Sequence, residues 1–168
     1  MSDATHIILR KLEPDDLSAL YAWENDADAW LDGDTHNPVS KADLREYILR
    51  TTGDVYQDGQ LRLIICHADA LQQPVGCVDL YNVDIRNRKA AVAIYIAPEY
   101  RRKGIALHAL KQLKSYVVSI LHFRFLYAFV RDANYPSLNL FQNVGFQNVA
   151  CLPNWVLEGD IFVLQTAL

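Results

Sequence analysis

Residues 89–130 hold the pattern that most restricts how this chain can fold: a strand, a long amphipathic helix and a second strand. Residues 89–96 and 125–130 are apolar runs of strand type, and residues 103–120 place small and aliphatic side chains on one helical face. Two strands joined by a single helix run parallel, because the crossover returns the chain to the same end of the sheet. The segment therefore predicts an α/β protein with one parallel strand pair.

The residues before this unit predict one strand, two helices and polar connections. Residues 6–11 are strand-like, and Pro14 opens a helix whose first turn is acidic. Residues 25–39 form a long polar connection, after which Ser40 is a good N-cap for a second helix. Residues 57–60 are turn-like.

Strand periodicity then takes over. Residues 61–67, 74–81 and 89–96 are three strand-like runs separated by short polar links. Neighbouring strands with such short links pair antiparallel, so these residues predict a meander.

The end of the chain adds one helix and two strands. Pro136 lies where a helix begins, and Gly145 suits the C′ position beyond it. Residues 146–152 and 155–164 form a closing pair of strands. The predicted order is β-α-α-β-β-β-α-β-α-β-β: an α/β fold with a mixed, mostly antiparallel central sheet flanked by helices, in one domain spanning residues 1–168.

Composition excludes several classes of protein. The net charge of −4 argues against a nucleic-acid partner, and no apolar run reaches the ~20 residues that span a bilayer. The three cysteines form no CxxC pair, and the five histidines make no cluster with metal-ligand spacing. We therefore expect a cytoplasmic protein with no membrane, no nucleic acid and no metal.

A short basic turn links the first strand of the crossover unit to its helix. It reads Arg101-Arg102-Lys103-Gly104, and Ala106 follows in the first helical turn. Free N–H groups at a helix N-terminus bind anions, and the small residues Gly104 and Ala106 let a pyrophosphate approach the backbone. The alternative is a basic loop that only starts a helix. The turn has too few glycines for a Walker A loop or a dinucleotide fingerprint.

The pattern Arg101-x-x-Gly104-x-Ala106 resembles the Arg/Gln-x-x-Gly-x-Gly/Ala signature of the GNAT superfamily of N-acetyltransferases. The resemblance extends in element order over nearly the whole chain. Within the family, the branch of ribosomal-protein and spermidine or diamine acetyltransferases is the most similar. The other matching pieces are Ala22-Trp23-Glu24-Asn25-Asp26 to Trp30, Pro38-Val39-Ser40, Asn134-Tyr135-Pro136-Ser137 and Val144-Gly145-Phe146.

The resemblance implies an acyltransferase that uses acetyl-CoA as cosubstrate and needs no metal. It implies that the strand before the signature splays from its neighbour and offers its backbone to the pantetheine arm at Tyr95, Ile96 and Ala97. It also implies an asparagine, Asn134, near the thioester end. The backbone N–H groups expected to bind the pyrophosphate are those of Arg101, Arg102, Lys103, Gly104, Ile105 and Ala106.

The proton donor to the leaving thiolate departs from the family pattern. Many relatives have a tyrosine four residues before the glycine of the Gly-Phe pair, where this chain has Phe141. Ser137 is the first substitute, because some ribosomal-protein acetyltransferases use a serine in this context, and Tyr135 is the second. The non-catalytic alternative for Ser137 is a hydroxyl that forms a hydrogen bond with the local backbone in the first helical turn.

The general base is left open. Relatives often carry a glutamate on the strand before the signature, but residues 90–96 contain no acid. Asp79 interrupts an apolar strand and is one candidate; Glu24 and ordered water are the others. The bland alternative for Asp79 is an outward-facing residue on an alternating strand.

The acceptor side is expected in the first helix and the loop after it. Relatives close this region over the acceptor, and its carboxylates would attract a polycation. Trp23 and Trp30 could pack against an alkyl chain or a cation, although such residues often only anchor a core or loop. A solvated acidic loop is the alternative. The expected acceptor-binding residues are Glu24, Asp28, Trp30 and Asp32, with Asp26 and Asp34 nearby.

The leading function is therefore direct transfer of an acetyl group to a small amine such as spermidine. One alternative is acetylation of a protein N-terminus or lysine. Another is a non-catalytic acyl-CoA-binding regulatory module, which Phe141 and the missing strand glutamate would suit. The partners are then a small-molecule or peptide amine, and exposed strands near the C-terminus can pair two subunits into a homodimer.

Overall fold

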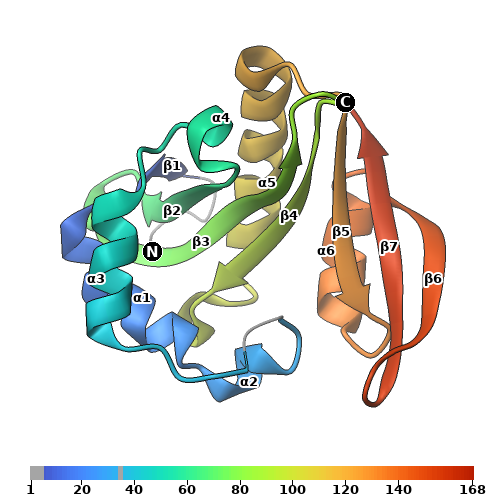
Figure 1. The fold of residues 1–168 in the computed structure, drawn as a ribbon, viewed down its shortest axis with the longest axis horizontal. Coiled ribbons are helices and arrows are strands. Elements are labelled where there is room, and N and C mark those ends of the chain that lie inside the picture. Colours follow the sequence, from blue (N-terminus) through green and yellow to red (C-terminus); the bar gives the residue numbers. More distant parts are fainter. Residues whose placement is uncertain (1–5, 34–35) are drawn as a thin grey trace.

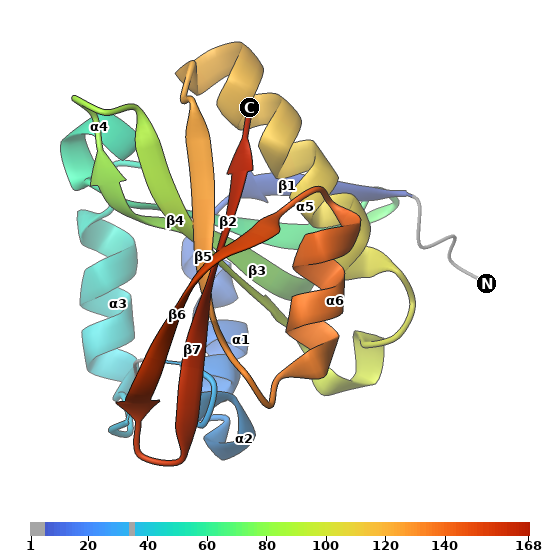
Figure 2. The same ribbon diagram turned by 90° about the vertical axis from the view of Figure 1, so that its right-hand side faces the viewer.

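The computed structural model describes residues 6–33 and 36–168. Its strands form a seven-stranded sheet in the order β1-β2-β3-β4-β5-β7-β6 (Figure 1). Helices cover both faces: α1 and α3 lie on one side, and α5 and α6 lie on the other (Figure 2). The predicted α/β fold with a mixed, mostly antiparallel sheet is confirmed. The strands are β1 (Ile7–Lys11), β2 (Leu61–His67), β3 (Ala70–Asp84), β4 (Lys89–Ile96), β5 (Phe125–Arg131), β6 (Gln147–Val156) and β7 (Gly159–Ala167).

The N-terminal helices begin where the sequence places their caps. Pro14 opens a short 3-10 turn (Pro14–Asp16) that leads into α1 (Leu17–Glu24). Ser40 caps α3 (Lys41–Arg50) through a capping box with Asp43. Residues 25–39 are not wholly irregular as expected, because the Asp26 side chain caps a one-turn helix, α2 (Ala27–Trp30).

The predicted meander is confirmed, with two corrections. Strand β3 is longer at both ends than residues 74–81, because its hairpin with β4 continues to the pair Asp84↔Lys89. It also passes through Pro74, where the register with β2 shifts, and proline is tolerated at such a bulge. Residues 57–60 are not a simple turn: α4 (Val55–Asp58) precedes Gly59, which ends it in the left-handed conformation.

The crossover helix is shorter than residues 103–120. Helix α5 (Ile105–Tyr116) begins after Gly104 and gives way to a π-helical turn (Val117–Leu121). Hydrophobic periodicity does not register this change, since the side chains of Val117 and Leu121 stay buried.

The last elements are α6 (Tyr135–Asn143) and a β6–β7 hairpin. Gly145 has φ +93°, as its predicted C′ position requires. The closing strands differ from their predicted bounds. Residues 155–156 belong to β6 and not to the last strand, and the turn at Leu157 precedes β7. Trp155, an aromatic residue expected to start the last strand, instead lies next to the end of β6 with 68 % of its surface exposed.

The sheet opens between its two central strands. β4 and β5 are the parallel pair, but their pairing stops after Lys89↔Phe125, Ala90↔Leu126 and Ala91↔Tyr127. Beyond Ala91 the two strands diverge (Figure 1). The remainder of β4 stays paired with β3 on one side only.

Two apolar clusters hold the sheet in place. The larger lies under α5 and includes Leu110, Leu113, Leu126 and Phe141. The smaller lies between the sheet and helices α1 and α3. Cys66 and Cys77 are buried free thiols. Among the described residues, no helix is long and apolar enough to cross a membrane.

Candidate active site

The diverging end of β4 provides an open strand edge. The Ala97 N–H donates to the Val75 carbonyl of β3 (3.0 Å), so β3 satisfies that side. The Ile96 carbonyl instead accepts a bond from the Arg101 side chain at 2.8 Å. Backbone groups on such an unpaired edge can bond an extended polar ligand as a strand would. The predicted pantetheine residues Tyr95, Ile96 and Ala97 thus lie where the sheet opens.

The N-terminus of α5 lies just beyond this edge. Gly104, its N-cap, has φ +77°, and the helix has no side-chain cap. A Cβ built on Gly104 would meet nothing closer than a His108 carbon at 4.0 Å, so the space beside the loop is open. Arg102 also has positive φ (59°). First-turn N–H groups without a cap, on an open surface, fit a pyrophosphate.

The three cations of this loop are not equally available to an anion. Arg101 is drawn back to the Ile96 carbonyl, and its guanidinium lies over the Tyr95 ring at 5.6 Å. The Lys103 ammonium donates to the Glu99 carbonyl at 2.9 Å. Arg102 is exposed. The loop therefore offers an anion mainly its backbone N–H groups, and Arg102 is the one of its three cations without a hydrogen bond or ion pair among the described residues.

The predicted donor residues meet at the start of α6. Asn134 caps this helix by accepting from the Ser137 N–H at 3.1 Å. The Ser137 hydroxyl makes no hydrogen bond within the described residues, so the backbone-bonded alternative is not what the structure contains. Tyr135 is 69 % exposed. Phe141 is buried in the core against Phe146, with ring centroids 5.0 Å apart.

Asp79 faces an arginine that the sequence analysis missed. Arg62 of β2 is its cross-strand partner and donates to both Asp79 oxygens at 2.7 Å. The same guanidinium donates to Glu24 of α1 at 2.5 Å and lies over the Tyr47 ring of α3. Burial raises the pKa of the Tyr47 hydroxyl. Asp79 is therefore paired with an arginine and is not the outward-facing residue that was the alternative.

Asp26 joins the acceptor loop to the cofactor loop. Its carboxylate accepts a hydrogen bond from the Tyr95 hydroxyl at 2.8 Å and lies 3.7 Å from the Arg101 guanidinium. Burial and this hydrogen bond raise the pKa of the Tyr95 hydroxyl. Trp23 is buried and packs against the Tyr95 ring. The sequence placed Asp26 in the acidic loop but carried no signal of these partners.

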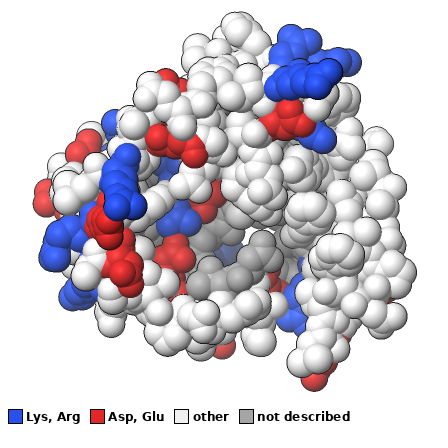
Figure 3. Space-filling model, in the orientation of Figure 1, with Lys and Arg blue, Asp and Glu red and all other residues white. Residues whose placement is uncertain are grey.

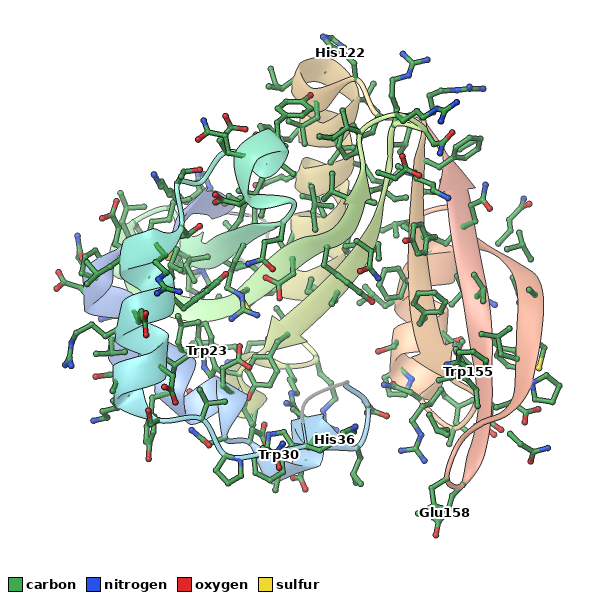
Figure 4. All side chains as sticks on the ribbon, viewed as in Figure 1. Trp23, Trp30, His36, His122, Trp155 and Glu158 are labelled. Atoms are coloured by element: carbon green, nitrogen blue, oxygen red, sulfur yellow. The ribbon has the colours of Figure 1, made fainter. Side chains whose placement is uncertain are left out.

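The other end of the same loop is tied to β5. Arg131 donates to the Leu31 carbonyl at 2.9 Å and lies 3.7 Å from Asp32. The Trp30 indole donates to the Glu24 carbonyl at 2.8 Å, and Trp30 lies at the loop in Figure 4. Contacts with Tyr95 of β4 and Arg131 of β5 thus hold residues 26–32 across the diverging strands.

The acidic residues of this loop differ in their surroundings. Glu24, Asp26 and Asp32 each contact an arginine, whereas Asp28 is exposed. Asp34 lies outside the described residues. Figure 3 shows acidic and basic atoms recessed in a hollow on this face, so the charges gather below the surface as well as on it.

Comparison with known proteins shows the family to which the chain belongs. The spermidine N(1)-acetyltransferase of Escherichia coli is 27% identical over 149 residues, which cover 87% of this chain and 75% of the relative. An N-alpha-acetyltransferase of Saccharolobus solfataricus is 32% identical over 69 residues, 41% of each chain. The crystal structure of spermidine N-acetyltransferase from Vibrio cholerae in complex with CoA and spermine has a TM-score of 0.84 at 22% identity and covers 97% of this chain and 96% of that chain. The model of the acetyltransferase (GNAT) domain matches residues 6–147. The chain therefore belongs to the GNAT family of acetyltransferases, as the Arg101-x-x-Gly104-x-Ala106 signature predicted.

Proposed function

We propose that this enzyme transfers the acetyl group of acetyl-CoA to a primary amine of a polyamine such as spermidine. The observation that carries the proposal is the junction of the open β4 edge with the uncapped N-terminus of α5. The first can hold the amides of the pantetheine arm, and the second can hold the pyrophosphate. The spermidine acetyltransferases among the relatives support the choice of acceptor.

The charge along the acceptor loop and its contacts favours a cationic acceptor. Five carboxylates stand against three guanidinium groups, which leaves an excess of two negative charges. Most of this charge is paired, so the attraction is weaker than the acidic sequence alone suggested. An ammonium beside a partly neutralised carboxylate still gains charge-assisted hydrogen bonds. The groups counted are Glu24, Asp26, Asp28, Asp32 and Asp79 against Arg62, Arg101 and Arg131.

The residues can support direct transfer without a covalent enzyme intermediate. A backbone N–H on the unpaired part of β4 can stabilise the developing oxyanion. The Asn134 side-chain amide can donate to the pantetheine arm, since its oxygen already caps α6. The Ser137 hydroxyl, which has no protein partner in the described residues, can protonate the leaving thiolate.

The acceptor is tested by following CoA release with spermidine, putrescine and a panel of peptides carrying free N-termini or lysines. We expect turnover with the polyamines and at least tenfold lower kcat/KM with every peptide. Higher kcat/KM with peptides would replace the proposal by a protein acetyltransferase. Acetyl-CoA binding without turnover of any amine would favour a regulatory module.

The donor is tested by Ser137→Ala, with Ser115→Ala as the matched control. Ser115 is an exposed serine of α5 whose hydroxyl bonds to the Lys111 carbonyl. Loss of a general acid lowers kcat by about 10²-fold or more. We expect that loss for Ser137→Ala alone, with unchanged affinity for CoA. Equal kcat for the two variants would exclude Ser137 and leave Tyr135 as the candidate.

The protein is also proposed to self-associate through β6. This strand forms one edge of the sheet, and most of its side chains are exposed, including Val149 and Trp155. An exposed edge can pair with a second copy. Light scattering during gel filtration should give more than the 19.1 kDa of one chain.

A further inference from the structure

Three charged side chains form a row that ends at the opening of the sheet. Arg62 of β2 is opposite Asp79 of β3, and Asp79 is opposite Ala93 of β4. Ala93 has no partner on β5, and its side chain is exposed. Glu24 reaches the same guanidinium from α1. The row therefore connects the acceptor helix to the strand edge that the cofactor is proposed to occupy.

The two carboxylates are bound to Arg62 in different ways. Arg62 Nε and one terminal nitrogen each donate a hydrogen bond of 2.7 Å to a different oxygen of Asp79. The other terminal nitrogen donates a single hydrogen bond to Oε1 of Glu24. The second oxygen of Glu24 has no partner within the described residues. A bidentate guanidinium occupies a carboxylate more fully than a single bond does, so Glu24 retains the greater capacity to accept a proton.

The surroundings keep this arrangement rigid. The exposed fractions of the Arg62, Asp79 and Glu24 side chains are 19%, 22% and 22%. The Tyr47 ring lies against the guanidinium, and Cys77 precedes Asp79 by two residues on the same strand face. Burial raises the pKa of the Cys77 thiol, so it stays neutral beside the pair. One guanidinium between two carboxylates leaves one negative charge.

We propose that Glu24 is the proton acceptor for the attacking amine and that Arg62 is the positioning residue that holds it, with Asp79 as its fixed counter-ion. The inference rests on the proposed function, because it assigns a role within that reaction. It selects one of the three open candidates for the base, and it adds Arg62, which no local pattern in the sequence indicates.

The amine loses two protons on its way from an ammonium to an amide. The ammonium first loses one proton to water, and the neutral nitrogen forms the new C–N bond as the C–S bond breaks. The nitrogen becomes far more acidic as this bond forms, so an ordinary carboxylate can take its second proton. Ser137 protonates the leaving sulfur and recovers a proton from solvent, to which Glu24 releases the one it took.

The experiment compares Glu24→Ala with Asp79→Ala in the presence and absence of formate. Each variant leaves Arg62 paired with the other carboxylate, so neither creates an unpaired buried charge, and thermal melting checks that both fold. We expect kcat with spermidine to fall about 10²-fold in Glu24→Ala. Added formate should then restore kcat at least tenfold in Glu24→Ala and not in Asp79→Ala.

Arg62→Lys supplies the positioning test. Lysine keeps the charge but cannot bridge two carboxylates in fixed geometry. We expect about a tenfold loss of kcat, with CoA affinity unchanged and little response to formate. Glu24→Asp should recover part of the activity lost in Glu24→Ala.

Several results would overturn the inference. Formate rescue of Asp79→Ala alone would make Asp79 the acceptor, and no rescue of either variant would show that neither carboxylate takes the proton. Wild-type protein that acetylates no amine would refute the proposed function itself. An active wild type with the wrong rescue pattern refutes only the role of Glu24.

Discussion

Replacing Gly104 by alanine tests the cofactor site, because the structure contains a control for its backbone cost. Gly104 and Gly59 both have left-handed backbone conformations, with φ angles of +77° and +66°. Neither site has a crowded neighbour: the nearest atom is 4.0 Å away at Gly104, and nothing lies within 4 Å at Gly59. Alanine at either position therefore costs only the left-handed conformation, about 1–2 kcal/mol. For a chain of this size that lowers Tm by about 2–8 °C.

The two variants should differ in binding. Gly104 begins α5 at the proposed pyrophosphate site, whereas Gly59 ends α4. A methyl group at Gly104 enters the open space through which the anion approaches, and any relaxation of φ turns the N–H groups away. We expect Gly104→Ala to weaken CoA binding at least tenfold by isothermal titration calorimetry, which is about 1.4 kcal/mol or more. Gly59→Ala should bind as wild type does. Equal affinities in both variants would refute the assignment of the loop.

Three other substitutions each test the role of one side chain in the site or in the fold. Asp26→Asn should lower the pKa of Tyr95, because it removes the negative charge of the carboxylate that accepts a hydrogen bond from the Tyr95 hydroxyl. In an absorbance titration, phenolate should then form at a lower pH in the variant than in the wild type. Phe141→Ala should reduce the free energy of unfolding by about 3–5 kcal/mol in urea. Phe129→Ala, where the ring is 41 % exposed, should cost much less; similar losses would contradict the packing assigned to Phe141. Burial raises the pKa of Asp58, but hydrogen bonds from threonine hydroxyls and backbone N–H groups outweigh it and hold the pKa below 3.8. Because folding lowers the pKa of Asp58, the ionised carboxylate stabilises the fold above pH 3.8, and this stabilisation is lost as the pH falls through the folded pKa. Asp58→Asn should remove that part of the dependence of Tm on acid pH. An unchanged dependence in the variant would refute the role of Asp58.

The fold was largely predictable because local signals agreed with one another. Ser40 and Pro14 start helices where N-cap and proline rules place them, and the short links around β3 require antiparallel pairing. The errors fall where tertiary contacts override local pattern. β3 extends because β4 continues to pair with it, and residues 155–156 belong to β6 because its pairing with β7 continues to Val156↔Gly159.

The geometry of the candidate site was predictable only where the backbone forms it. The signature at residues 101–106 and the Asn134 cap reflect the geometry of a helix start, which the structure contains, and their role in binding the cofactor stays a prediction. The side-chain partners were not found, because they join residues far apart in sequence. Arg62 is 17 residues from Asp79 and 38 from Glu24. The strand register brings Arg62 opposite Asp79, and the packing of α1 against the sheet brings Glu24 to the same guanidinium.

The unpaired stretch of β4 makes the fold itself sensitive to ligand supply. Over more than half of its length, β4 lacks a paired neighbour among the described residues on the β5 side, and the pantetheine arm can occupy that side. Ligand bound only to the folded state adds RT ln(1 + [L]/Kd), about 2.7 kcal/mol at one hundred times Kd. We therefore expect the resistance of this enzyme to heat and proteolysis to rise and fall with the concentration of its acyl donor. Its abundance in a cell would then follow the supply of acetyl-CoA.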